Sequence, residues 1–198
     1  MDIRLGSVIS LIVCGTLLVF AVSRFASYRR RKSNELRLSK ISQLPLRSQT
    51  FCAFIAAEMS SQLWVEWENA NDLPRFGARL KQCVQLWLDG KASDDQLAAS
   101  GDELLKTLPT DLSMFHNQSA GQAGWALFHV SQIALDKCDD LHWDTLCNCI
   151  FYSAAAATHT RRPPFKQLGI TYSQLTAKEC DFLDEWWESC CCRFPELK

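Results

Sequence analysis

The chain has 198 residues, of which 47% are hydrophobic and 22% are charged. This length fits one domain with an accessory segment, and this composition excludes wholesale disorder. The net charge of −1 combines two parts of opposite sign. Residues 1–47 have nine basic and two acidic groups, a net of +7, whereas residues 48–198 have 12 basic and 20 acidic groups, a net of −8. The acidic body argues against a nucleic-acid groove, because phosphate binding depends on clustered Lys and Arg. The basic arm by itself is compatible with nucleic acid, but its position directly after an apolar segment favours lipid headgroups, so we expect no nucleic-acid partner.

The N-terminal region contains an uncharged apolar run at residues 5–23. As a helix, these 19 residues would span roughly 28 Å, close to the hydrocarbon thickness of a bilayer. We predict that residues 1–23 form a single transmembrane anchor in contact with membrane lipids. Two alternatives are a cleaved signal peptide and a buried core helix. The first would need a more basic start and a shorter run, and the second rarely lacks charge over this length.

Residues 24–47 follow the run as a basic juxtamembrane connector. This connector contains a membrane-proximal basic cluster, which consists of Arg29, Arg30, Arg31 and Lys32. Such a cluster favours contact with anionic lipid headgroups. Because the flank after the run is far more basic than the flank before it, we expect the N-terminus outside and the C-terminal domain in the cytoplasm.

Cysteine usage agrees with a reducing compartment. Of ten Cys, Cys14 lies within the apolar run, and nine remain in the body. An odd number cannot pair completely within one chain, and the spacing shows no disulfide framework of a small domain. We therefore expect reduced thiols, most of them buried as small hydrophobic side chains.

The body, residues 48–198, has helical periodicity almost throughout. Apolar residues recur four apart from Phe51 to Trp67, and Asn71 with Asp72 then interrupts the pattern. A second stripe runs from Leu73 to Trp87 and ends at Gly90, a suitable C-terminal cap. No alternation of strand type appears. The sequence predicts an all-α fold: one transmembrane helix followed by a helical bundle or short helical array of about six helices.

Helix starts and breaks follow in the second half of the body. Ser93 with Gln96 and Thr176 with Glu179 have the spacing of capping boxes. We expect a further helix to open at residues 139–140 and a loop over residues 163–172 after two consecutive prolines. The small side chains Ala154 to Ala157 should let a neighbouring helix approach closely.

Catalytic and metal sites are weakly indicated. The candidate zinc ligands are His129, Cys138, His142, Cys147, Cys149 and His159. Two cysteines separated by one residue point about 200° apart on a helix, so Cys147 and Cys149 cannot face one metal. A Cys–His nucleophile pair would use the same residues, without a flanking signature. We predict no catalytic, metal or cofactor-binding residue, and a membrane-bound enzyme that uses Cys and His or zinc stays an alternative.

The last helix contains the candidate partner contact. Trp186 and Trp187 are adjacent, so both cannot face the same side of a helix, and one of them is available to a partner or the membrane interface. Asp181, Asp184, Glu185 and Glu188 are typical of a solvated face. Among the thiols of Cys190 to Cys192, we expect two to be partly buried and one exposed.

Some residues resemble a known group of proteins. Trp87 to Gly90, Ser93 to Leu97 and the run Ala154 to Ala157 with His159 together resemble bacterial all-helical immunity proteins of polymorphic toxin systems, over roughly residues 54–160. The resemblance implies a protein that binds and neutralises a partner, without catalytic residues.

These features together predict a membrane-anchored helical protein-binding module, possessing an acidic surface or an exposed Trp for its protein partner. A structural subunit of a membrane complex is a further alternative.

Overall fold

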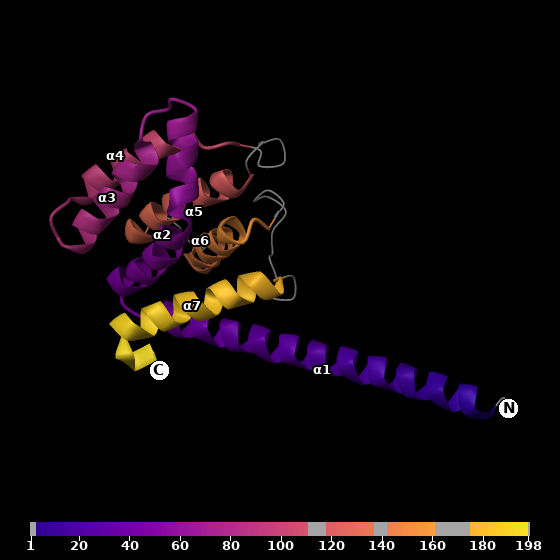
Figure 1. Ribbon diagram of the computed structural model, residues 1–198. Helices are drawn as coiled ribbons and strands as arrows, with labels where there is room; N and C mark the ends of the chain where they lie inside the picture. Colours follow the sequence, from indigo (N-terminus) through magenta and orange to yellow (C-terminus); the bar gives the residue numbers. More distant parts are fainter. Residues whose placement is uncertain (1–2, 111–117, 137–141, 161–174, 198) are drawn as a thin grey trace.

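The computed structural model describes residues 3–110, 118–136, 142–160 and 175–197. Within these ranges, the side chains of residues 3–14, 17, 23, 27, 31, 142 and 143 are not described. The described residues form seven α-helices and one short 3₁₀ helix, and no strand occurs among them (Figure 1). The helices are α1 (Ile3–Ser42), α2 (Leu46–Ala70), α3 (Phe76–Leu88), α4 (Asp94–Leu105), α5 (Gln118–Ala134), α6 (His142–Ala157), α7 (Ala177–Arg193) and the 3₁₀ helix η4 (Pro195–Leu197).

The predicted all-α class is confirmed, and six α-helices of the described chain, α2 to α7, make up the body. Helix α1 runs without interruption from the apolar run through most of the basic connector. No helix within the described part of the chain is long and apolar enough to cross a membrane. Of the predicted span 5–23, the side chains of residues 5–14, Leu17 and Ser23 lie outside that described part.

The core lies among α2, α5 and α6, which pack on one another most extensively (Figure 1). The pair α3 and α4 covers one side of this core, and α7 contacts α2 and α6 on another. Ala154, Ala155 and Ala156 are fully buried on α6. Their small side chains allow the close approach of α5 and α2 that the sequence predicts.

Local capping signals in the sequence are confirmed. Ser93 Oγ accepts a hydrogen bond from Gln96 N, and the Gln96 side chain accepts one from Ser93 N, which completes a capping box. Thr176 and Glu179 form the same reciprocal arrangement at the start of α7. Gly90 follows the end of α3 with a φ of +75°, a conformation that favours glycine.

The orientation of α2 differs from the prediction. The expected stripe from Phe51 to Trp67 is half-buried, whereas Ala53, Ala57 and Trp64 of the same helix are fully buried. Small residues face inward because α2 lies in the centre of the bundle, where α5 and α6 approach it closely. Hydrophobicity alone therefore identified the helix and not its innermost face.

Candidate functional site

The basic connector docks on the acidic face of α7, with α1 and α7 side by side (Figure 1). Arg30 Nη1 lies 3.0 Å from Asp181 Oδ1, and Arg30 Nη2 lies 3.9 Å from Asp184 Oδ2. Two turns further along α1, Arg37 pairs with Asp184. Asp181 and Asp184, predicted to be solvated, are thus partners of the connector. The opposite net charges of the two parts of the chain meet at this contact.

Trp187 extends this contact toward the C-terminus of α7. The guanidinium carbon of Arg37 lies 5.6 Å from the centre of the Trp187 ring, and Lys40 Nζ lies 5.9 Å from it. A cation over an aromatic face is attracted by the ring quadrupole. Lys40 Nζ also donates a hydrogen bond to Leu197 O at 2.8 Å.

Apolar burial makes the C-terminal part of α1 an integral part of the body. Leu38 and Ile41 belong to the hydrophobic core, with exposed fractions of 1% and 0%. Exposed ion pairs alone contribute only about 0–1 kcal/mol each, so these two side chains are the stronger attachment. The ion pairs of Arg30 and Arg37 add a weaker contact between α1 and α7 upstream of these two residues.

The two candidate tryptophans have different environments. Trp186 is buried in the core, where its Nε1 donates a hydrogen bond to Cys52 O at 2.9 Å. Trp187 is half-buried beneath the cations of α1. The prediction that the adjacent rings face different sides is confirmed, but Trp186 is not at the surface. A partner contact through Trp187 stays a prediction.

The residues of the membrane-proximal basic cluster have different partners. All three described members of the cluster, Arg29, Arg30 and Lys32, are exposed, and Arg30 is the one that pairs with α7. The guanidinium carbon of Arg29 lies 5.0 Å from the centre of the Phe25 ring. The side chain of Arg31 lies outside the described residues. Arg29 and Lys32 are therefore the members of the cluster that form no ion pair with the body among the described residues.

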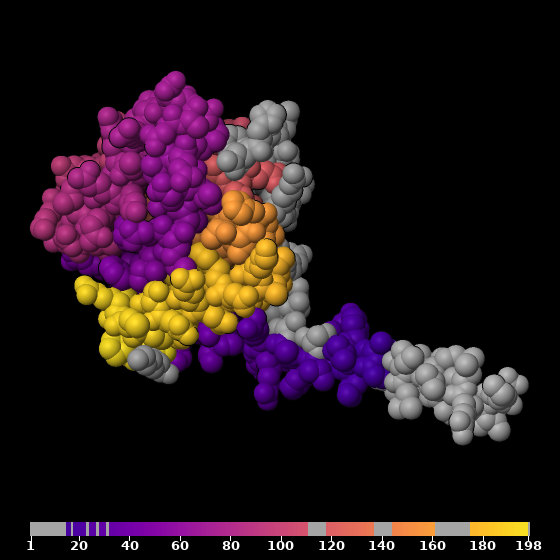
Figure 2. Space-filling view, viewed as in Figure 1, coloured from indigo at the N-terminus to yellow at the C-terminus, as the bar shows by residue number. Residues whose placement is uncertain are grey.

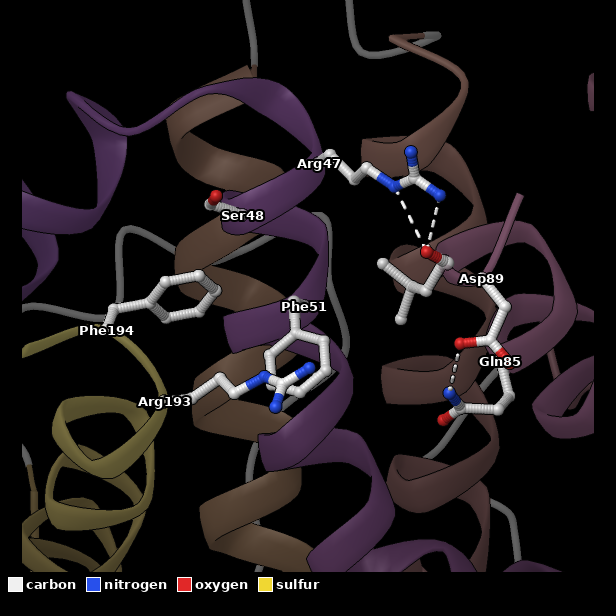
Figure 3. A pocket seen from close by; sticks show the side chains of 8 residues that line it. Arg47, Ser48, Phe51, Gln85, Asp89, Arg193 and Phe194 are labelled. Atoms are coloured by element: carbon white, nitrogen blue, oxygen red, sulfur yellow. Dashed lines mark hydrogen bonds between the residues drawn. The ribbon is translucent and has the colours of Figure 1, made fainter.

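A separate surface pocket lies where the start of α2 meets the C-terminal ends of α3 and α7 (Figure 3). Its volume is about 220 Å³. The lining combines two arginines with apolar and polar side chains, namely Arg47, Ser48, Phe51, Gln85, Leu88, Asp89, Arg193 and Phe194. Sequence reasoning missed this pocket, because its residues are distant in the chain and carry no motif.

Arg47 holds one wall of the pocket in place. Its Nε donates to Leu88 O at 3.1 Å and its Nη2 donates to Trp87 O at 3.2 Å, so it satisfies carbonyls at the end of α3. Such carbonyls have no partner within their own helix. Figure 3 shows the Arg47 side chain reaching from α2 to this carbonyl of Leu88.

The candidate zinc and nucleophile residues are dispersed. No group of three or more His, Cys, Asp or Glu that could hold a metal occurs in the described ranges, and the side chains of Cys138 and His142 lie outside those ranges. His129 is buried beside the rings of Trp125 and Tyr152, and burial lowers its pKa to about 3. His159 is exposed, with Nδ1 at 3.1 Å from Ser119 Oγ.

The described thiols of this set are buried. Cys147 is 9% exposed and Cys149 is fully buried. Cys149 Sγ lies 3.4 Å from Ala126 O and 3.6 Å from Ala53 O. Burial raises the pKa of the Cys149 thiol, which suppresses the thiolate that a nucleophile needs. In the C-terminal run, Cys190 and Cys191 are buried and Cys192 is exposed, as the sequence indicated.

Glu68 is a buried carboxylate that the sequence did not reveal. Its Oε1 accepts hydrogen bonds from Trp64 Nε1 at 2.9 Å and from Gly77 N at 2.8 Å. Burial raises its pKa, against the opposing effect of these hydrogen bonds. The spacing of Trp64 and Glu68, one turn apart on α2, is the only signal that could have indicated this pair. Its role is to join the end of α2 to the start of α3.

Comparison with known proteins gives no relative. No family model matches this chain, and neither a curated protein nor a solved structure matches it.

Proposed function

We propose that this protein is a membrane-anchored helical protein-binding module. In this proposal, residues 5–23 cross the bilayer, the basic connector 24–47 adjoins the headgroups, and the body 48–198 binds a protein partner in the cytoplasm. Neutralisation of a toxin, which the resemblance to immunity proteins implies, is one specific form of this function.

Helix α1 extends beyond the body (Figures 1 and 2), and the observation that carries the proposal is the exposure of its apolar side chains there. Leu18, Val19, Phe20 and Val22 are between 57% and 69% exposed on a helix that continues from the apolar run. Contiguous apolar surface of this kind is unfavourable in water and marks a membrane or protein interface. The 19 uncharged residues of the run favour the membrane.

The charge order supports the orientation and the lipid contact. Arg24, Arg29 and Lys32 are exposed on α1 directly after the apolar run. Basic side chains at this position attract anionic headgroups and retain their flank in the cytoplasm. Because Asp181 and Asp184 are already paired with α1, we infer that the protein partner binds elsewhere on the acidic body.

Membrane fractionation tests the anchor. We expect the full chain to resist carbonate extraction from membranes, and the double variant Ile12→Arg/Thr16→Arg to become extractable. Each central arginine costs roughly 2.5–3.5 kcal/mol of insertion free energy. The matched control, Ser33→Arg/Leu36→Arg, adds the same charges at exposed positions of α1 beyond the run and should behave like the unaltered chain. Extraction of the unaltered chain would overturn the anchor.

Reporter fusions test the orientation in a bacterial host. We expect a cytoplasm-active reporter to work when fused after residue 47 or after Lys198. Activity of a periplasm-active reporter at the same positions would reverse the proposed orientation. Release of a shortened protein from the membrane would identify the apolar run as a signal peptide.

A further inference from the structure

The pocket between α2, α3 and α7 is basic, although it lies on an acidic body. Its lining contains Arg47 and Arg193 and a single carboxylate, Asp89. That carboxylate is already engaged, since Asp89 Oδ1 accepts a hydrogen bond from Gln85 Nε2 at 3.2 Å and Asp89 Oδ2 lies 3.6 Å from Lys91 Nζ. The charge available to a ligand in the pocket is therefore positive.

The two arginines of the lining have N–H groups that donate to no described residue and can therefore donate to a ligand. Arg193 forms no hydrogen bond or ion pair with the residues that the structure describes, and Arg47 Nη1 forms none either. An arginine presents five N–H donors in a planar fork that matches a carboxylate. Arg193 also lies in the last turn of α7, where its charge is favourable, but that interaction does not satisfy its donors.

The other walls of the pocket are aromatic and apolar. The guanidinium carbon of Arg193 lies 5.5 Å from the centre of the Phe51 ring, and the rings of Phe51 and Phe194 meet edge to face with centres 5.6 Å apart (Figure 3). The ring of Phe51 attracts this cation and keeps it beside the aromatic wall. Leu88 adds an aliphatic wall on the side of α3.

We propose that this pocket binds a carboxylate attached to an apolar side chain, such as the terminal residue of a polypeptide or a small apolar acid. The carboxylate pairs with Arg193, and the apolar group lies against Phe51 and Phe194. The volume of about 220 Å³ is smaller than the range of about 300–1,000 Å³ typical of larger ligands, so a single residue is the appropriate size. If the ligand is the C-terminal residue of a polypeptide, the pocket is part of the surface that binds the protein partner, and this form of the inference rests on the proposed function.

Calorimetric titration of the full chain in detergent tests the pocket, with the heat of titration into protein-free detergent subtracted. The probes are N-acetyl-phenylalanine and its uncharged amide. We expect the amide to bind at least about threefold more weakly, because it lacks the charge that pairs with Arg193. Binding of the acid should weaken as salt is raised.

Substitution of Arg193 in the pocket, compared with substitution of an arginine outside it, localises the binding. Arg193→Gln should weaken binding of N-acetyl-phenylalanine by at least about threefold, which is within the range of a partly exposed charge pair. The matched control is Arg79→Gln, since Arg79 is also an exposed arginine over a phenylalanine ring, with its guanidinium carbon 5.8 Å from the centre of Phe76. This control should leave the affinity unchanged.

Equal affinity for the acid and the amide, or equal loss in both arginine variants, would overturn the proposal. A pentapeptide ending in phenylalanine separates the two sources. If it binds at least about tenfold more tightly than N-acetyl-phenylalanine, the ligand is a chain end, and equal affinity identifies a small acid. Failure of these titrations would leave the carbonate-extraction result unaffected, so failure of the pocket and failure of the anchor are distinguishable.

Discussion

Glu68 connects two helices through one carboxylate oxygen. While Oε1 accepts two hydrogen bonds, Oε2 is buried and has no hydrogen-bond partner among the residues that the structure describes. An unsatisfied buried charge is costly, and burial accordingly dominates the raised pKa of this carboxyl group. The start of α3 has no side-chain cap of its own, so Glu68 supplies an acceptor to a helix terminus that would otherwise lack one.

The raised pKa of Glu68 predicts a pH-dependent stability. Above its usual pKa of 4.5, the folded state retains a proton that the unfolded state loses. The stabilisation from this proton is full below pH 4.5 and is lost as the pH rises through the folded-state pKa. Relative to the unaltered chain, the unfolding free energy of Glu68→Gln should therefore rise between pH 4 and pH 7, because the variant has no proton to lose in this range.

Denaturant titrations at the two pH values, followed by tryptophan fluorescence, measure this difference. A constant difference at both pH values would show that the carboxyl group does not titrate in this way. Asp102→Asn, at an exposed position of α4, is the control and should show no comparable change.

Gly77 is required by a close approach. A Cβ atom at this position would lie 2.3 Å from Trp64 Cδ1, within a buried ring that also donates to Glu68. We expect Gly77→Ala to lower the unfolding free energy by about 1–3 kcal/mol, the usual cost of overpacking. Gly101→Ala is the control for a contact with a short polar side chain, since its Cβ would meet Ser131 Oγ at 2.8 Å and Ser131 Cβ at 3.5 Å. Rotation of this hydroxyl would break only its hydrogen bond to Phe128 O, so we expect a smaller loss than at Gly77. Equal losses in both variants, measured by denaturant titration, would contradict the contact with Trp64.

At the scale of elements, the contact between α1 and α7 predicts a charge-dependent protection of α1. Asp184→Lys should repel Arg30 and Arg37 and so raise the rate of tryptic cleavage after these residues several-fold, since exposed pairs contribute up to about 1 kcal/mol each. Glu188→Lys is the matched control, because Glu188 lies on the same helix without an ion pair among the described residues. Restored protection of the bond after Arg30 in the double variant Arg37→Glu/Asp184→Lys would confirm the pairing, because Arg37→Glu itself removes the tryptic site at residue 37. Unchanged cleavage in Asp184→Lys would refute it.

Helix termini were the most predictable elements. Ser93, Thr176 and Gly90 act through neighbours only a few residues away, so their spacing in the sequence determines their geometry. The innermost face of α2 was not predictable in the same way. It depends on which helices surround α2, and that information is distributed over the whole chain.

At the scale of the whole molecule, the all-α class and the six helices of the body followed from periodicity in the sequence. The opposite charges of the two parts were also visible there. The contact between these opposite charges was not visible in the sequence, because it requires α7 to lie beside α1, and the paired residues are more than 140 positions apart in the chain. The pocket between α2, α3 and α7 has the same origin, since Arg47 and Arg193 come from distant segments that only the fold brings together.

The continuity of α1 couples the rotation of its two ends. Each residue of an α-helix turns the chain by about 100° and advances it by about 1.5 Å. Ile3–Ser42 is one helix, and its last turns are fixed to the body by Leu38 and Ile41. The number of residues between the apolar run and the body therefore sets how far the body is rotated about the α1 axis relative to the apolar run. Insertion of one residue near Ala26 would move the body by only about 1.5 Å along the α1 axis but would rotate it by about 100° about that axis, relative to the apolar run.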